Sequence, residues 1–286
     1  MRISSFYALF SYVSVQLVSF VVGWLFIKNT VSIVENSADV GNSVFFFAYI
    51  IFAAIMMLLV LKFYKGKRLF YFMELFLLFL ASLMFFALFT EDATTPVLLA
   101  FAMVAIRIFY KDARNMLLLF VSAVIGGLLG ASLDIIPAAV LALLLSLYDF
   151  AAVFLTKHMV KLAQELRARN AAFSVTFPFR APEKKLVKKL GKTNRGKKKL
   201  EEIRRSFETI ELGTGDLVIP GMLVVAALKI SFWHGIAALI GGSAGIFLLF
   251  YAIDTKKGYW PALPPIVFFS LLATLIYSLV APLLFK

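Results

Sequence analysis

The chain has 286 residues, of which 62% are hydrophobic, and its mean hydropathy of +0.93 lies far above that of a soluble globular domain. This apolar content is enough for roughly nine membrane spans of ~20 residues each. Cysteine is absent, which excludes a disulfide framework and thiolate metal sites, and the net charge of +13 is unevenly distributed. The composition therefore predicts an all-α polytopic membrane protein.

Hydropathy divides the chain into nine apolar segments, each of which we expect to form a transmembrane helix. The segment that begins near residue 135 has Pro137 in its first turn, where the missing N–H costs little. The nine expected helices cover approximately residues 4–27, 43–61, 69–89, 95–109, 115–130, 135–156, 210–228, 232–253 and 263–284.

The order of these segments predicts three parts. Residues 1–156 form a membrane bundle of six helices, residues 157–209 form a basic loop, and residues 210–286 form a second bundle of three helices. Within the loop, apolar residues alternate over 173–179, which favours a short extended strand. The basic run 184–205 is expected to lie against anionic lipid head groups of the bilayer. Because no recognition fold accompanies this charge, we expect no nucleic-acid partner.

The lysines and arginines predict the orientation of the helices. With the N-terminus inside, 26 of the 29 basic residues fall on the inner side, and only Lys28, Lys229 and Lys286 fall outside. Positive charge is concentrated on the cytoplasmic side of membrane proteins. We therefore expect the N-terminus and the 157–209 loop inside and the C-terminus outside.

Two aspartates lie within expected helices. Asp149 is about seven residues before the end of the helix 135–156, and Asp216 is about six residues after the start of the helix 210–228. At ~1.5 Å per residue, both carboxyl groups lie roughly 9–10 Å from the same membrane boundary. Carboxylates at such depth usually mark a pathway, a relay or a catalytic site. If the two helices are neighbours, the pair can share a proton and act as acid and base on a peptide bond, without metal or cofactor.

Two further features surround these aspartates. Gly213 and Gly215 flank Thr214 and remove side chains next to Asp216, so that backbone or substrate can approach closely. Pro220 frees the carbonyl group of Asp216 from helical hydrogen bonding. The run Pro261, Ala262, Leu263, Pro264, Pro265 predicts an irregular backbone that borders the site.

Other polar and small residues have simpler interpretations. Gln16 is expected to make a hydrogen bond between helices. Glu74 is expected to extend from the inner end of its helix to the membrane interface. The pairs Gly126 with Gly130 and Gly241 with Gly245 have the spacing of close helix packing. The two histidines are far apart in the sequence and no HExxH motif is present, which excludes a metalloprotease.

Three motifs in this order resemble those of the presenilin and signal peptide peptidase family, the GxGD intramembrane aspartyl proteases. They are Tyr148-Asp149, the GTGD sequence 213–216, and Pro261-Ala262-Leu263. The resemblance covers the whole chain, and the short length and minimal loops are similar to those of a microbial, archaeal presenilin homologue. It implies that Asp149 and Asp216 are catalytic, that Tyr148 and residues 213–215 complete the active-site motif, and that residues 261–263 bind substrate. The predicted N-in orientation is the presenilin-like one.

The predicted function is therefore that of an intramembrane aspartic endopeptidase which cleaves transmembrane helices of other proteins. In a microbe it would be located in the plasma membrane. One alternative is a proton-coupled transporter or channel that uses the aspartates as a relay. Another is a prepilin-type peptidase, against which the nine helices and the segment 261–263 argue. Whether the protein forms a homo-oligomer is left open by the sequence.

Overall fold

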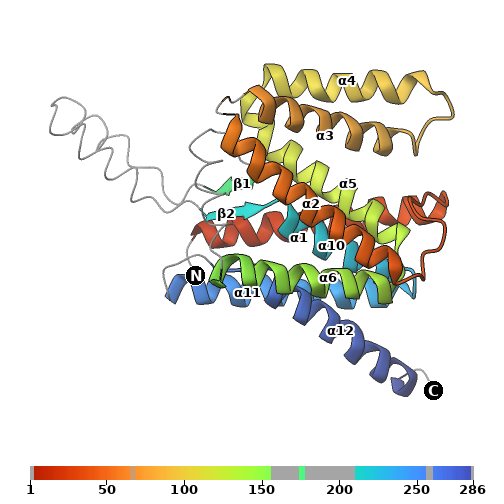
Figure 1. The fold of residues 1–286 in the computed structure, drawn as a ribbon. Helices are drawn as coiled ribbons and strands as arrows, with labels where there is room; N and C mark the ends of the chain where they lie inside the picture. The colour runs from red at the N-terminus through yellow and green to blue at the C-terminus, as the bar shows by residue number, and fades with distance from the viewer. Residues whose placement is uncertain are drawn as a thin grey trace, which may run out of the picture.

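The computed structural model describes residues 3–155 apart from 65 and 67, and residues 174–177, 210–255 and 260–284. Within these ranges it contains nine α-helices and two short strands, as the sequence predicts for an all-α membrane protein (Figure 1). The elements are α1 (Ile3–Lys28), α2 (Gly41–Phe63), α3 (Arg68–Phe86), α4 (Thr94–Phe109), the 3-10 turn η1 (Lys111–Ala113), α5 (Arg114–Ser132), α6 (Ile135–Phe150), the π-helical turn η2 (Ala151–Leu155), β1 (Ser174–Phe177), β2 (Ile210–Gly213), α10 (Gly215–Leu228), α11 (Phe232–Thr255) and α12 (Leu263–Leu284).

Helix α10 is the centre of the bundle. It packs against α1, α5, α6, α11 and α12, and almost every residue from Leu217 to Leu228 is buried. Helices α3 and α4 form a pair on one side of this centre, and α6, α11 and α12 lie on the other (Figure 1). The fold therefore surrounds the helix that carries Asp216 with protein on all sides.

Two glycine pairs permit the closest helix contacts, as their spacing predicts. On α5, a Cβ atom at Gly126 would lie 2.9 Å from the carbonyl oxygen of Val218, and one at Gly130 would lie 2.5 Å from that of Met222. On α11, Gly241 and Gly245 approach the backbone of α12 in the same way. Small residues let helix backbones meet in membranes, where dispersion contacts replace the hydrophobic effect between helices.

Among the residues that the structure describes, six helices are long and apolar enough to cross a membrane, and three further apolar stretches are shorter. The short ones are Gly41–Met57, Thr94–Phe109 and Gly215–Leu228. The 14 residues of α10 extend only about 21 Å, less than the ~30 Å of a hydrocarbon core. A helix this short cannot cross the hydrocarbon core by itself, so at least one of its ends lies inside the membrane.

The start of α10 differs from the sequence prediction. We expected a helix from residue 210, but residues 210–213 form β2, and α10 begins only at Gly215. β2 pairs antiparallel with β1, with Leu212 opposite Val175 and Gly213 opposite Ser174. Residues 210–213 pair with a distant strand and do not extend the helix, because Gly213 and Gly215 are poor helix formers. The strand predicted over 173–179 is thus present as β1, and the rest of that segment lies outside the described residues.

The remaining boundaries are close to those expected. Helix α3 ends at Phe86 rather than near residue 89, α5 extends to Ser132, and regular α6 ends at Phe150 and continues as the π-helical turn η2. Apart from β1, the loop 157–209 and its basic run lie outside the described residues.

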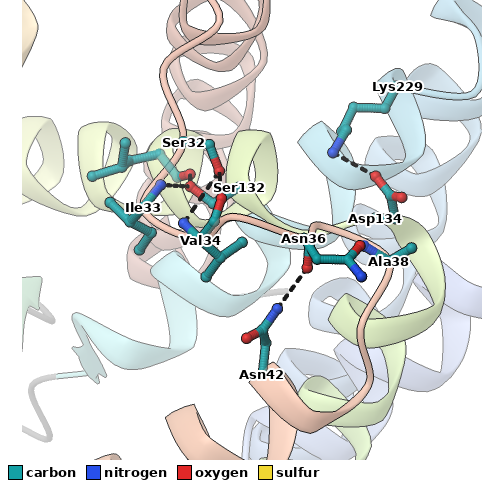
Figure 2. Close-up of polar contacts among 10 residues, drawn as sticks. Ser32, Ile33, Val34, Asn36, Ala38, Asn42, Ser132, Asp134 and Lys229 are labelled. Carbon is teal, nitrogen blue, oxygen red and sulfur yellow. Dashed lines mark hydrogen bonds and ion pairs between the residues drawn. The ribbon is translucent and has the colours of Figure 1, made fainter.

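At the end of the bundle opposite β1 and β2, the α1–α2 connection is fastened to the ends of α5, α6 and α10 (Figure 2). The backbone N–H of Ile33 donates to the Ser132 hydroxyl oxygen at 3.0 Å, and that of Asp134 donates to the carbonyl oxygen of Ser37 at 2.9 Å. Asp134 also forms an ion pair with Lys229 at the C-terminal end of α10. These contacts hold the chain ends of three core helices in one place.

Candidate active site

Asp216 lies in the first turn of α10, directly after β2, and not six residues inside a longer helix as predicted from the sequence. Its side chain is half-buried and accepts a hydrogen bond from the backbone of Gly213. A Cβ atom at Gly213 would lie 3.1 Å from Asp216 Oδ2, so the absence of a side chain there lets the carboxyl group approach the strand. The same reasoning fails for Gly215, whose Cβ position has no neighbouring atom within 4 Å.

The position of Asp216 suits a carboxylate for two reasons. The first turn of a helix exposes unpaired N–H groups and the positive end of the helix dipole, both of which favour negative charge. Pro220, one turn later, has no N–H to donate to the Asp216 carbonyl group. The backbone around Asp216 is therefore less fully hydrogen-bonded than the interior of an ordinary helix.

Asp149 lies in the last turn of regular α6 and is 9% exposed. The π-helical turn η2 follows at once, and such turns are rare and are often found at functional sites. The backbone N–H of Leu263, the first residue of α12, donates to Asp149 Oδ2 at 3.3 Å. Asp149 thus connects the end of α6 to the start of α12.

The structure brings the two aspartates together. Helices α6 and α10 pack against each other, and the Asp149 and Asp216 carboxyl groups lie close enough to interact electrostatically. Because η2, the loop 157–209 and β2 separate them along the chain, only the fold can create this pair. Tyr148 is half-buried beside Asp149, and Thr214 precedes the first residue of α10.

The segment 261–263 borders this pair. Pro261, Ala262 and Leu263 are all buried. Only the first two precede the helix; Leu263, Pro264 and Pro265 form the first turn of α12, so the irregular backbone predicted over 261–265 is limited to residues 261 and 262. Ala262 belongs to the same apolar cluster as Leu217, the neighbour of Asp216. The segment therefore contacts both sides of the site, through a hydrogen bond to Asp149 and through packing near Asp216.

A cavity of about 60 Å³ lies between α3, α4, α5 and α10 and reaches Thr214. Its walls are mainly aliphatic, with Glu74 and Arg107 as the charged lining residues. Since one water molecule needs roughly 10–15 Å³ of such volume, a few waters can be held here beside the GTGD motif.

The position of Glu74 corrects the sequence prediction, which placed this side chain at the membrane interface. Glu74 is 9% exposed, and its Oε1 lies 2.7 Å from Nε of Arg107 on α4. The pair neutralises both charges, which explains how the carboxylate can remain inside the bundle. Gln16 behaves as predicted: its Nε2 donates to the carbonyl oxygen of Leu217 at 3.2 Å and so connects α1 to α10.

Sequence reasoning overlooked Tyr12, which lies one turn before Gln16 on α1. Its side chain is completely buried and interacts electrostatically with Asp216. The available signal was a second polar side chain four residues from Gln16, hence on the same face of an apolar helix.

Comparison with known proteins identifies the family. The family described as signal-peptide peptidase, presenilin aspartyl protease matches residues 8–280, nearly the whole chain. The chain belongs to this family. It is an intramembrane aspartyl protease and a multi-pass integral membrane protein, which confirms the resemblance drawn from the three motifs.

Two solved structures of a presenilin family intramembrane aspartate protease share the fold of this presenilin-family chain. Both superpose with a TM-score of 0.65 and are 23% identical in sequence. The structure in space group P2 covers 95% of this chain and 96% of its own, and that in space group C222 covers 96% and 99%. A comparison with the curated proteins found no match. Family membership leaves no support for the transporter or the prepilin-type peptidase alternative.

Proposed function

We propose that Asp149 and Asp216 are the catalytic pair of this protease and that they hydrolyse a peptide bond within a transmembrane helix of another membrane protein. The observation that carries the proposal is that α6 and α10 pack together and bring the two carboxyl groups, one buried and one half-buried, within electrostatic range of each other. Two carboxyl groups so placed do not both ionise readily and instead share one proton.

A shared proton gives the two aspartates complementary roles. The ionised carboxylate accepts a proton from water while the water oxygen attacks the scissile carbonyl carbon. The protonated partner donates its proton to the carbonyl oxygen. In the second step the C–N bond of the tetrahedral intermediate breaks as its nitrogen accepts a proton from one aspartate, while one hydroxyl group of the gem-diol returns its proton to the other aspartate. The products are a carboxylic acid and an amine, and no metal or cofactor takes part.

The proposed role of segment 261–263 follows from its two contacts. The hydrogen bond from Leu263 to Asp149 orients one carboxyl group, and the backbone of Pro261 and Ala262 before the helix is available for an unwound substrate. A substrate helix must lose its own hydrogen bonds near the scissile bond, and replacement partners are needed at membrane depth. The edges of the β1–β2 pair offer a second set of such partners, through addition of a strand.

The test is cleavage of a transmembrane peptide by the purified protein in detergent, with products identified by mass. Asp149→Asn and Asp216→Asn are each expected to reduce cleavage at least about a thousandfold, and the double variant should lose little more, because the pair acts as a unit. A hydroxyl-bearing transition-state mimic should inhibit the wild type.

The matched control is Asp134→Asn, the same substitution at the opposite end of the bundle (Figure 2). This variant should cleave at the wild-type rate. Near-normal cleavage by either Asp149→Asn or Asp216→Asn would contradict the assignment of the dyad.

A further inference from the structure

The hydroxyl group of Tyr12 is an unexplained feature of the bundle. The side chain is 0% exposed, and its hydroxyl oxygen has no hydrogen-bond partner among the residues that the structure describes. Leaving a buried hydroxyl unpaired costs about 1–3 kcal/mol. Phenylalanine would fill the same space without that cost, so the oxygen requires a reason.

Tyr12 lies where four helices meet beside the proposed dyad. It shares one apolar cluster with Leu217 of α10, Ala262 before α12 and Ile266 of α12. Its hydroxyl oxygen fits against Gly242 of α11, where a Cβ atom would lie only 2.7 Å away. The ring is therefore held on several sides, and the hydroxyl position is determined by packing.

The same face of α1 is fixed to the first turn of α10. Gln16, one turn after Tyr12, donates to the carbonyl oxygen of Leu217, the residue after Asp216. Tyr12 also lies within electrostatic range of the Asp216 carboxyl group. Among the described residues, that carboxyl group is also affected by the Asp149 side chain, which repels negative charge on it, and by the Gly213 backbone.

We propose that Tyr12 is a positioning residue whose hydroxyl group donates a hydrogen bond to the Asp216 carboxylate when substrate closes the site, an inference that rests on the proposed catalytic role of Asp216. Hydrogen bonds of active sites are often long or absent before substrate binds and shorten in the complex. In that state the bond fixes the orientation of the carboxylate and offsets its negative charge beside Asp149.

Tyr12→Phe tests this with the loss of one oxygen atom. A hydrogen bond to a charged group is worth enough for kcat to fall about ten- to a hundredfold, whereas KM should stay within about twofold. The melting temperature in detergent should be unchanged or higher, because a buried unpaired hydroxyl is removed. Tyr277→Phe is the matched control: this ring packs against His234 between α11 and α12 and should be dispensable for cleavage.

Gly242→Ala provides a second variant that does not depend on Tyr12→Phe. The added methyl group would lie 2.7 Å from the Tyr12 hydroxyl oxygen and 2.7 Å from Ser270 Oγ, so both oxygen atoms must shift and kcat should fall here too. In the double variant Tyr12→Phe/Gly242→Ala, the two losses should not add, since both remove one interaction.

Two results would overturn the inference: wild-type kcat in Tyr12→Phe, or a loss of kcat that is accompanied by an equal loss of thermal stability and of inhibitor binding, which indicates a purely structural role. Asp216→Asn is measured in parallel. If it is inactive while Tyr12→Phe is fully active, only the role of Tyr12 is refuted. If Asp216→Asn still cleaves, the proposed dyad fails and the role of Tyr12 fails with it.

Discussion

Asp149 and Asp216 keep their carboxyl groups inside a helix bundle, where each isolated charge would cost several kcal/mol to desolvate. In the proposed dyad, one shared proton leaves a single negative charge on the pair. That charge is met by the backbone N–H of Leu263 on one side and by the Gly213 backbone and the start of α10 on the other. The groups that stabilise these carboxylates are thus mainly backbone dipoles. Small residues such as Gly213 leave the backbone accessible to the carboxyl groups.

Asp134 presents the contrasting case of an aspartate that contributes to stability alone. It lies between two spans, and its hydrogen bond and ion pair with Lys229 lower its pKa below the ordinary value of 3.8. A lowered pKa means that the stabilising contribution is complete above the unfolded-state pKa and is lost as the pH falls through the folded-state pKa. Because the side chain is 39% exposed, the contribution is expected to be at most about 1 kcal/mol.

Asp134→Asn should therefore melt slightly earlier than the wild type at pH 6; the difference should begin to shrink near pH 3.8 and vanish once the pH is below the lowered pKa of the folded state. Lys229→Gln should lower the melting temperature at pH 6 by the same small amount. In the Lys229→Gln background, Asp134→Asn should then cause no further change in melting temperature. A difference between wild type and Asp134→Asn that persists unchanged at the lowest pH would show that charge on Asp134 is not responsible.

At the scale of elements, the contact between α5 and α10 predicts a steep cost for added volume. In Gly130→Ala, the new methyl group would lie 2.5 Å from the carbonyl oxygen of Met222, a rigid backbone atom. Overpacking of this kind is expected to destabilise the protein by about 1–3 kcal/mol, measured by thermal unfolding in detergent. The control is Gly215→Ala, whose Cβ position has no atom within 4 Å and which should be neutral or slightly stabilising. Equal melting temperatures for the two variants would contradict the close packing.

The hydrogen bond from Leu263 to Asp149 can be tested without a large side chain. Leu263 is the first residue of α12, a position that accepts proline, so Leu263→Pro removes the N–H donor at little cost to the helix. Leu263→Ala is the matched variant, because it also shortens the side chain but keeps the N–H. Cleavage by Leu263→Pro should be at least about tenfold slower than by Leu263→Ala. Equal rates would mean that the donor does not orient Asp149.

The elements that the sequence predicts best are those with a strong local signal. Continuous apolar runs located all nine helices, and alternation located β1, because each pattern is a property of neighbouring residues. The start of α10 was wrong because β2 depends on pairing with a strand more than thirty residues earlier. The burial of Glu74 was missed for the same reason, since its partner Arg107 lies on another helix. Tyr12 could be noticed from the sequence as a polar side chain on the same helix face as Gln16, but its position beside the site depends on contacts with α10 and α11.

For the molecule as a whole, the orientation in the membrane remains a prediction from charge. The predicted topology assigns 26 of the 29 lysines and arginines to the side that holds the loop 157–209, and the short loops alone predict the same bias. A reporter fused near Gly191 should therefore be read as cytoplasmic and one at Lys286 as external; both sites lie outside the described residues.

The orientation also determines which substrates the proposed dyad can cleave. A substrate helix must present its scissile bond to Asp149 and Asp216 in one direction, so a protease with its N-terminus inside should favour substrates whose N-terminus is outside. The same transmembrane sequence, expressed in both orientations with the protease in one membrane, should be cut predominantly in the N-out form. Preference for the N-in form together with an external Gly191 reporter would show that the protease has the opposite orientation in the membrane. Preference for the N-in form with a cytoplasmic reporter would instead show that the dyad accepts a backbone of opposite direction.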